Sequence, residues 1–111
     1  MLLQNGVGIE EEPYIALAQL GLNTPILSGC AWVDATAVDD GRRVVQHGNE
    51  SLVLGFHRRA GIDLSLGETG LKTVCELLDA GGASIESVPD IDVARWRKVL
   101  WYDLDPKRLD D

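Results

Sequence analysis

Two short segments at opposite ends of the chain hold the residue types best suited to chemistry. In the later one, residues 96–98 read Trp-Arg-Lys, so an aromatic side chain that can form an apolar wall lies two positions before Lys98. When hydride adds to a ketone, negative charge grows on the carbonyl oxygen, and a positioned proton donor lowers the barrier. A partly buried lysine can act as that donor. Taken alone, however, Lys98 is more simply a solvated residue on an amphipathic helix.

The earlier segment, residues 4–8, reads Gln-Asn-Gly-Val-Gly. A strand that ends in Asn-Gly leaves the Asn5 amide at the carboxyl end of a sheet, where α/β proteins bind ligands. Gly6 and Gly8 permit unusual backbone angles and the close approach of a ligand. Asn-Gly is also a common turn, so Asn5 taken alone is more simply a turn residue.

The histidines and cysteines carry weaker signals. His47 stands at the edge of a turn and is expected to satisfy backbone groups, whereas His57 has no motif around it and is expected at the surface. Cys30 and Cys75 are too few for a disulfide framework and lack metal-ligand spacing, so we expect a reduced pair and no metal site.

The composition is that of an ordinary soluble domain. The chain has 111 residues, of which 45% are hydrophobic and 25% charged, enough for one small core. Its net charge of -8 argues against nucleic acid, because phosphate binding needs a basic face. The N-terminus lacks the regions of a signal peptide, and no apolar run is long enough to cross a bilayer. We therefore expect a cytoplasmic protein without membrane contact.

The elements that must position these residues form an α/β pattern. Apolar spacing and capping signals predict helices over residues 13–20 and 68–80, and a last helix that opens at Pro89. The packing residues expected in that last helix are Ile91, Ala94, Val99 and Trp101. β-forming residues separated by tight turns predict a three-stranded antiparallel meander over residues 25–55. Residues 56–67 are expected to be a mobile connection, and residues 83–88 a further short strand.

In this order, the two segments resemble the middle of the ketopantoate reductase family. The catalytic lysine of that family lies in a Trp-x-Lys-(Leu/Val) segment after an Asp-Ile element, and this chain has Asp90-Ile91 followed by Trp-Arg-Lys-Val at residues 96–99. The family's Gln-Asn-Gly-x-Gly segment matches residues 4–8. Residues 29–36 resemble the family segment that follows, in which a backbone group near Ala35 touches the cofactor. The resemblance runs colinearly over residues 2–101.

This resemblance implies an α/β fold that comprises the end of a Rossmann-type sheet with a β-meander and the start of a truncated helical domain. Residues 1–88 would be the C-terminal part of the cofactor domain, residues 89–101 the start of the helical domain, and residues 102–111 a divergent polar tail. The implied activity is NADPH-dependent reduction of 2-dehydropantoate, or a related α-keto acid, in pantothenate biosynthesis. Lys98 would be catalytic and bind substrate, Asn5 would bind substrate and NADP, and Ala35 would bind NADP.

The chain departs from the family pattern at two places. No Gly-x-Gly-x-x-Gly loop for the cofactor's pyrophosphate is present, and Tyr102 and Pro106 stand where the family has substrate-binding asparagines. We therefore expect an inactive fragment in which Lys98 is an ordinary exposed lysine. The alternatives are a non-catalytic interaction domain that pairs with a full-length relative, and an acidic domain whose matches are accidental. A homo-oligomer is a further arrangement left open.

Overall fold

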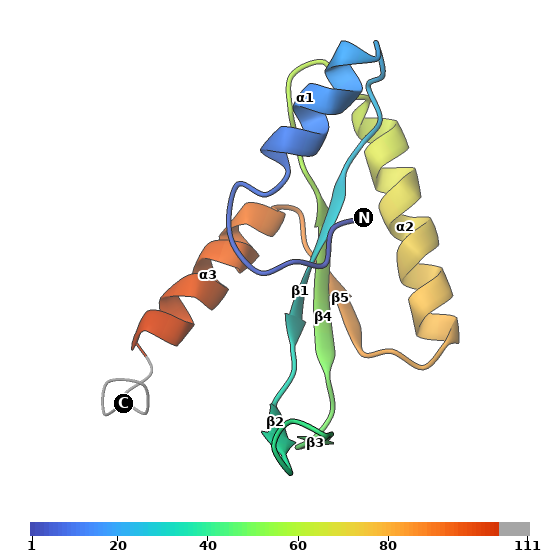
Figure 1. The fold of residues 1–111 in the computed structure, drawn as a ribbon. Helices are drawn as coiled ribbons and strands as arrows, with labels where there is room; N and C mark the ends of the chain where they lie inside the picture. Colours follow the sequence, from blue (N-terminus) through green and yellow to red (C-terminus); the bar gives the residue numbers. More distant parts are fainter. Residues whose placement is uncertain (105–111) are drawn as a thin grey trace.

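The protein is a mixed α/β structure, seen in a computed structural model that describes residues 1–104 (Figure 1). This confirms the predicted α/β class. The elements follow one another in the order α1 (Glu11–Gln19), β1 (Leu27–Trp32), β2 (Ala35–Val38), β3 (Arg43–Gln46), β4 (Ser51–Phe56), α2 (Leu64–Ala80), β5 (Ile85–Ser87) and α3 (Ile91–Leu104). None of the helices within residues 1–104 has both the length and the apolar character that a membrane span requires. Pro106 lies outside the described residues.

The main sheet has three strands in the order β1-β4-β5. β1 and β4 pair antiparallel from Leu27 opposite Phe56 to Trp32 opposite Ser51, whereas β4 and β5 run parallel. The N-terminal segment lies beside β1, because the Leu2 amide donates to the Leu27 carbonyl at 2.8 Å and the Leu2 carbonyl accepts from the Gly29 amide at 2.8 Å. The chain therefore enters the fold alongside its central hairpin.

The predicted three-stranded meander over residues 25–55 is wrong in its pairing. The expected first strand divides into β1 and β2, and β1 pairs with β4 rather than with its neighbour in sequence. β2 and β3 form a separate two-stranded hairpin beyond the end of the main sheet (Figure 1). The physical reason is burial: β1 and β4 each carry buried residues, whereas β2 and β3 carry none and cannot contribute to a core.

The connection predicted over residues 56–67 is shorter than expected. Phe56 belongs to β4, and α2 begins at Leu64 rather than at residue 68. The helix starts there because Asp63 caps it, its side chain accepting a hydrogen bond from the Leu66 amide at 3.2 Å. The predicted strand near residues 83–88 and the helix start after Pro89 are confirmed by β5 and α3.

A glycine in β4 sets the position of α3. A Cβ atom added at Gly55 would lie 2.9 Å from the Ile91 Cβ and 3.0 Å from the Val88 carbonyl oxygen, so only glycine lets the helix start rest on the strand. From this anchor, α3 turns Ile91, Arg95 and Lys98 toward the protein interior, at the spacing of one helix face. Of the other expected packing residues, Ala94 and Val99 are only half-buried and Trp101 is exposed.

Candidate functional site

The structure brings together Asn5 and Lys98, two predicted site residues that are 93 positions apart in sequence. The Lys98 Nζ donates a hydrogen bond to the Asn5 Oδ1 at 2.7 Å and another to the carbonyl oxygen of Ala31. Lys98 is only 6% exposed. The expectation of an ordinary exposed lysine is therefore wrong, because residues of the N-terminal segment and β1 enclose the ammonium group that α3 points inward.

Three elements create this contact. The pairing of Leu2 with β1 leads the chain on to Asn5 near the end of that strand, where Ala31 lies. The close packing of Ile91 against Gly55 fixes the first turn of α3, and Lys98 follows two turns later on the same face. Asn5 itself remains exposed, so its amide is open to a ligand from outside while it holds the buried ammonium.

The aromatic wall beside Lys98 comes from Trp32 rather than from Trp96. The Lys98 Nζ lies 5.5 Å from the centroid of the Trp32 ring, within the range of a cation–π interaction. Trp101 meets the Trp32 ring edge-on, with 6.5 Å between the ring centroids. Trp96 is 53% exposed and points away from the interior. The prediction that Trp96 would shield Lys98 is therefore wrong.

Two further predicted residues lie apart from Lys98. Ala35 is exposed in β2 and pairs with Gln46, and no contact joins β2 to α3 within the described residues. His47 is also exposed, and its backbone amide donates to the Asp34 carbonyl at 2.8 Å. Its side chain lines a surface cavity of about 430 Å³, shared with Trp32 and Trp101. His47 thus lies beyond the Trp32 wall, and Ala35 on the hairpin.

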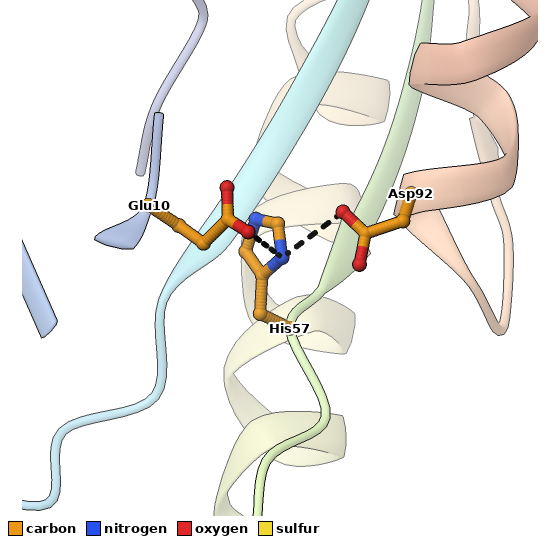
Figure 2. A group of neighbouring side chains, drawn as sticks. All are labelled: Glu10, His57 and Asp92. Carbon is orange, nitrogen blue, oxygen red and sulfur yellow. Dashed lines mark ion pairs between the residues drawn. The ribbon is translucent and has the colours of Figure 1, made fainter. Parts of the chain in front are cut away.

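A second group of polar side chains is buried where the start of α1, the end of β4 and the start of α3 meet (Figure 2). His57 is at its centre and is only 3% exposed, so its predicted place at the surface is wrong. The His57 Nε2 lies 2.6 Å from the Ser28 Oγ, a hydrogen-bond distance. The His57 Nδ1 faces Glu10 Oε1 at 3.8 Å and Asp92 Oδ1 at 3.5 Å.

The electrostatics of this group are unusual because Glu10 and Arg95 are buried beside His57, with the half-exposed Asp92 next to them. Burial lowers the pKa of His57 below its ordinary value, and this outweighs the opposite effect of the Glu10 and Asp92 carboxylates. Arg95, 1% exposed, places its Nη1 3.9 Å from the Glu10 Oε2. All three guanidinium nitrogens, Glu10 Oε2 and Asp92 Oδ1 are buried without a hydrogen-bond partner in the described part of the chain.

No family model matches the chain, and no curated protein matches it. The resemblance to ketopantoate reductases is therefore an expectation from the sequence, based on the motifs at residues 4–8, 29–36 and 90–99.

Proposed function

We propose that Asn5 and Lys98 belong to a ketopantoate-reductase-like active site, which reduces 2-dehydropantoate or a related α-keto acid with NADPH. The observation that carries the proposal is the 2.7 Å hydrogen bond from the Lys98 Nζ to the Asn5 Oδ1. Each residue lies in its own motif, and nothing in the local sequence of either one requires the two to meet. This contact supports a shared site better than it supports the alternative, in which Asn5 is only a turn residue and Lys98 only a solvated lysine.

The proposed chemistry assigns one role to each group around the ammonium. Lys98 gives a proton from its Nζ to the substrate's carbonyl oxygen as negative charge develops there. Asn5 Oδ1 and the Ala31 carbonyl accept hydrogen bonds from the same nitrogen and fix its position. The Trp32 ring flanks the ammonium and limits the access of water on that side. NADPH, when bound, supplies the hydride.

The residues present fit one end of that cofactor. The exposed Asn5 amide beside Lys98 can bind the nicotinamide end, with Ala35 as a more distant contact. The 111 residues contain no glycine-rich loop for the pyrophosphate, and a net charge of -8 disfavours a polyanion. This chain would therefore supply the part of the site that binds the substrate and the nicotinamide. In fold terms, β1, β4 and β5 would be the last strands of a nucleotide-binding sheet, and α3 the first helix of the helical domain.

A chimera tests this function. Residues 1–101 replace the corresponding segment of an active ketopantoate reductase, which supplies its own glycine-rich loop and helical domain. We expect NADPH-dependent reduction of 2-dehydropantoate, followed as loss of NADPH absorbance. Lys98→Ala should lower kcat by about 10²–10⁴-fold, the usual contribution of a positioned general acid. Arg97→Ala, which changes the exposed neighbour, should leave kcat unchanged.

Two results would contradict the proposal. One is a Lys98→Ala chimera that turns over 2-dehydropantoate as fast as the unmutated chimera. The other is a chimera that folds and binds NADPH with normal affinity but reduces no α-keto acid. Asn5→Ala adds an independent check, because loss of the amide should lower kcat and weaken substrate binding while the fold persists.

A second candidate function is a non-catalytic domain that pairs with a full-length relative. The observation in its favour is the outer face of α3, where Val93, Trp96 and Leu100 are exposed at the spacing of an apolar stripe. Sedimentation of the chain mixed with an intact ketopantoate reductase tests it. A complex that Trp96→Glu abolishes would favour this role, whereas two separate species would exclude it.

A further inference from the structure

We propose that Glu10, His57 and Asp92 form a binding site for a divalent transition-metal ion, for which Zn²⁺ is the appropriate probe. The site is separate from the Asn5–Lys98 pair and does not depend on the function proposed for it. It would join three parts of the chain that meet only in the folded protein: the residue before α1, the residue after β4 and the first turn of α3.

The geometry of the three ligand atoms suits a small cation. The His57 Nδ1, one Glu10 oxygen and one Asp92 oxygen all lie within 4.8 Å of one another. Figure 2 shows both carboxylates turned toward the same ring nitrogen. The Asp92 Oδ1 lies 3.5 Å from that nitrogen and the Glu10 Oε1 3.8 Å. Zinc–ligand bonds of about 2.0–2.1 Å in a tetrahedron place neighbouring ligand atoms roughly 3.3–3.4 Å apart. Small side-chain movements therefore bring the three atoms to coordinating positions.

The far side of the imidazole is also arranged as in metal sites. Ser28 is fully buried, and its Oγ lies 2.6 Å from the His57 Nε2. A histidine that binds a metal usually donates its other ring N–H to such a partner, which fixes the tautomer and the ring orientation. The ring has two tautomers: in one, Ser28 donates to Nε2 and the Nδ1–H faces the carboxylates; in the other, which a metal selects, Nε2 donates to Ser28 and the Nδ1 lone pair points at the two carboxylates. That arrangement is repulsive until a cation lies between them.

Unsatisfied oxygens at the same place point independently to a ligand. The Glu10 side chain is 8% exposed, and its Oε2 is buried without a hydrogen bond, with the Arg95 Nη1 3.9 Å away. The Asp92 Oδ1, which faces the His57 Nδ1, is also buried without a hydrogen bond, although the Asp92 side chain as a whole is 49% exposed. A buried carboxylate oxygen without a donor is destabilising, and a coordinated cation removes that penalty.

The ligand set and the surrounding charge restrict which ion can bind and how tightly. One imidazole and two carboxylates, with water completing the shell, suit zinc better than Mg²⁺ or Ca²⁺, which require six or more oxygens. Two carboxylates and one guanidinium leave one negative charge around a neutral His57. Arg95 opposes a dication, so we expect micromolar affinity rather than the tighter binding of structural zinc sites.

Titration calorimetry of the whole chain with ZnCl₂ at neutral pH tests the site. A Cys75→Ser background removes the half-buried thiol, which could bind zinc on its own. We expect one zinc ion per chain, with affinity at least about tenfold weaker in Asp92→Asn and in Glu10→Gln. Asp90→Asn is the matched control: it removes a nearby exposed carboxylate that accepts from the Asp92 amide at 3.0 Å, and should leave zinc affinity nearly unchanged.

A second readout separates coordination from general electrostatics. At the same zinc concentration, the melting temperature should rise more in the parent and in Asp90→Asn than in Asp92→Asn. Because half of the Asp92 side chain is already exposed, Asp92→Asn should fold normally, and circular dichroism checks this even if Glu10→Gln fails to fold. The proposal is overturned if the parent binds no zinc, if Asp92→Asn binds it equally well, or if only His47→Gln abolishes binding.

Discussion

The Lys98 ammonium donates to the Asn5 side chain across 2.7 Å, although 93 positions separate the two residues. The contact joins the two ends of the fold, because Asn5 lies in the N-terminal segment and Lys98 in the third turn of the last helix. It also makes Lys98 a structural residue as well as a candidate proton donor. A single substitution should therefore affect both stability and the proposed chemistry.

Lys98→Ala should destabilise the protein. The change removes hydrogen bonds from a charged donor to Asn5 and to Ala31, and it removes a buried aliphatic stem. We expect the free energy of unfolding to fall by about 2–3 kcal/mol. Urea denaturation measures the change. Arg97→Ala, one position earlier and exposed, should shift the same quantity by no more than about 0.5 kcal/mol. Equal effects of the two substitutions would show that the buried ammonium contributes nothing to stability.

Gly55→Ala should also destabilise the protein, because the new methyl group would meet Ile91 at 2.9 Å and the Val88 carbonyl at 3.0 Å. Displacing α3 from β4 should lower the free energy of unfolding by about 1–3 kcal/mol. Gly70→Ala in α2 should have the opposite effect on stability, because no atom outside the local helix backbone lies within 4 Å of the added Cβ. It should stabilise the helix by about 0.5–1 kcal/mol. Thermal melts of the two variants should move in opposite directions.

Local signals in the sequence predict the elements of this fold better than their pairing. Helical spacing marks α2, and Pro89 marks the start of α3, since both signals depend on residues close together in the chain. The partner of β1 is decided instead by which strands carry core residues, such as Cys30 and Leu54. Tight turns favour pairing of neighbours, and this is why the predicted meander differs from the observed sheet.

In the candidate sites, too, local signals identify residues but not the contacts between them. Asn5 and Lys98 stand in recognisable motifs, so both are found from the sequence, but their contact depends on long-range packing. The group around His57 has no such motif. Its side chains come from three distant segments, and the inward face of α3 carries Arg95 and Lys98 where an apolar pattern would be expected. Periodicity of apolar residues cannot reveal a buried charged cluster.

The two free cysteines should differ in reactivity. Burial raises the pKa of Cys30, and the Arg95 and Lys98 charges offset this only in part; burial also raises the pKa of Cys75. Cys30 is buried in β1, whereas Cys75 is half-buried in α2. At mildly alkaline pH, a disulfide reagent such as dithionitrobenzoate should modify one thiol in the native protein and the second only after unfolding. In Cys75→Ser, the native-state reaction should disappear; a fast thiol in that variant would contradict the burial of β1.

The purified chain should bind NADPH weakly or not at all. The pyrophosphate of a dinucleotide needs an array of backbone N–H donors at a glycine-rich turn and helix start, and the 111 residues contain no such loop. The net charge of -8 adds repulsion. Contacts at the nicotinamide end alone should not provide the binding free energy of roughly 8 kcal/mol that corresponds to a micromolar dissociation constant. Fluorescence titration of the chain measures this, with the chimera that carries a glycine-rich loop as the positive control. Micromolar binding by the chain alone would mean that its own residues hold the pyrophosphate, and that the cofactor site extends beyond the one assigned to Asn5 and Lys98.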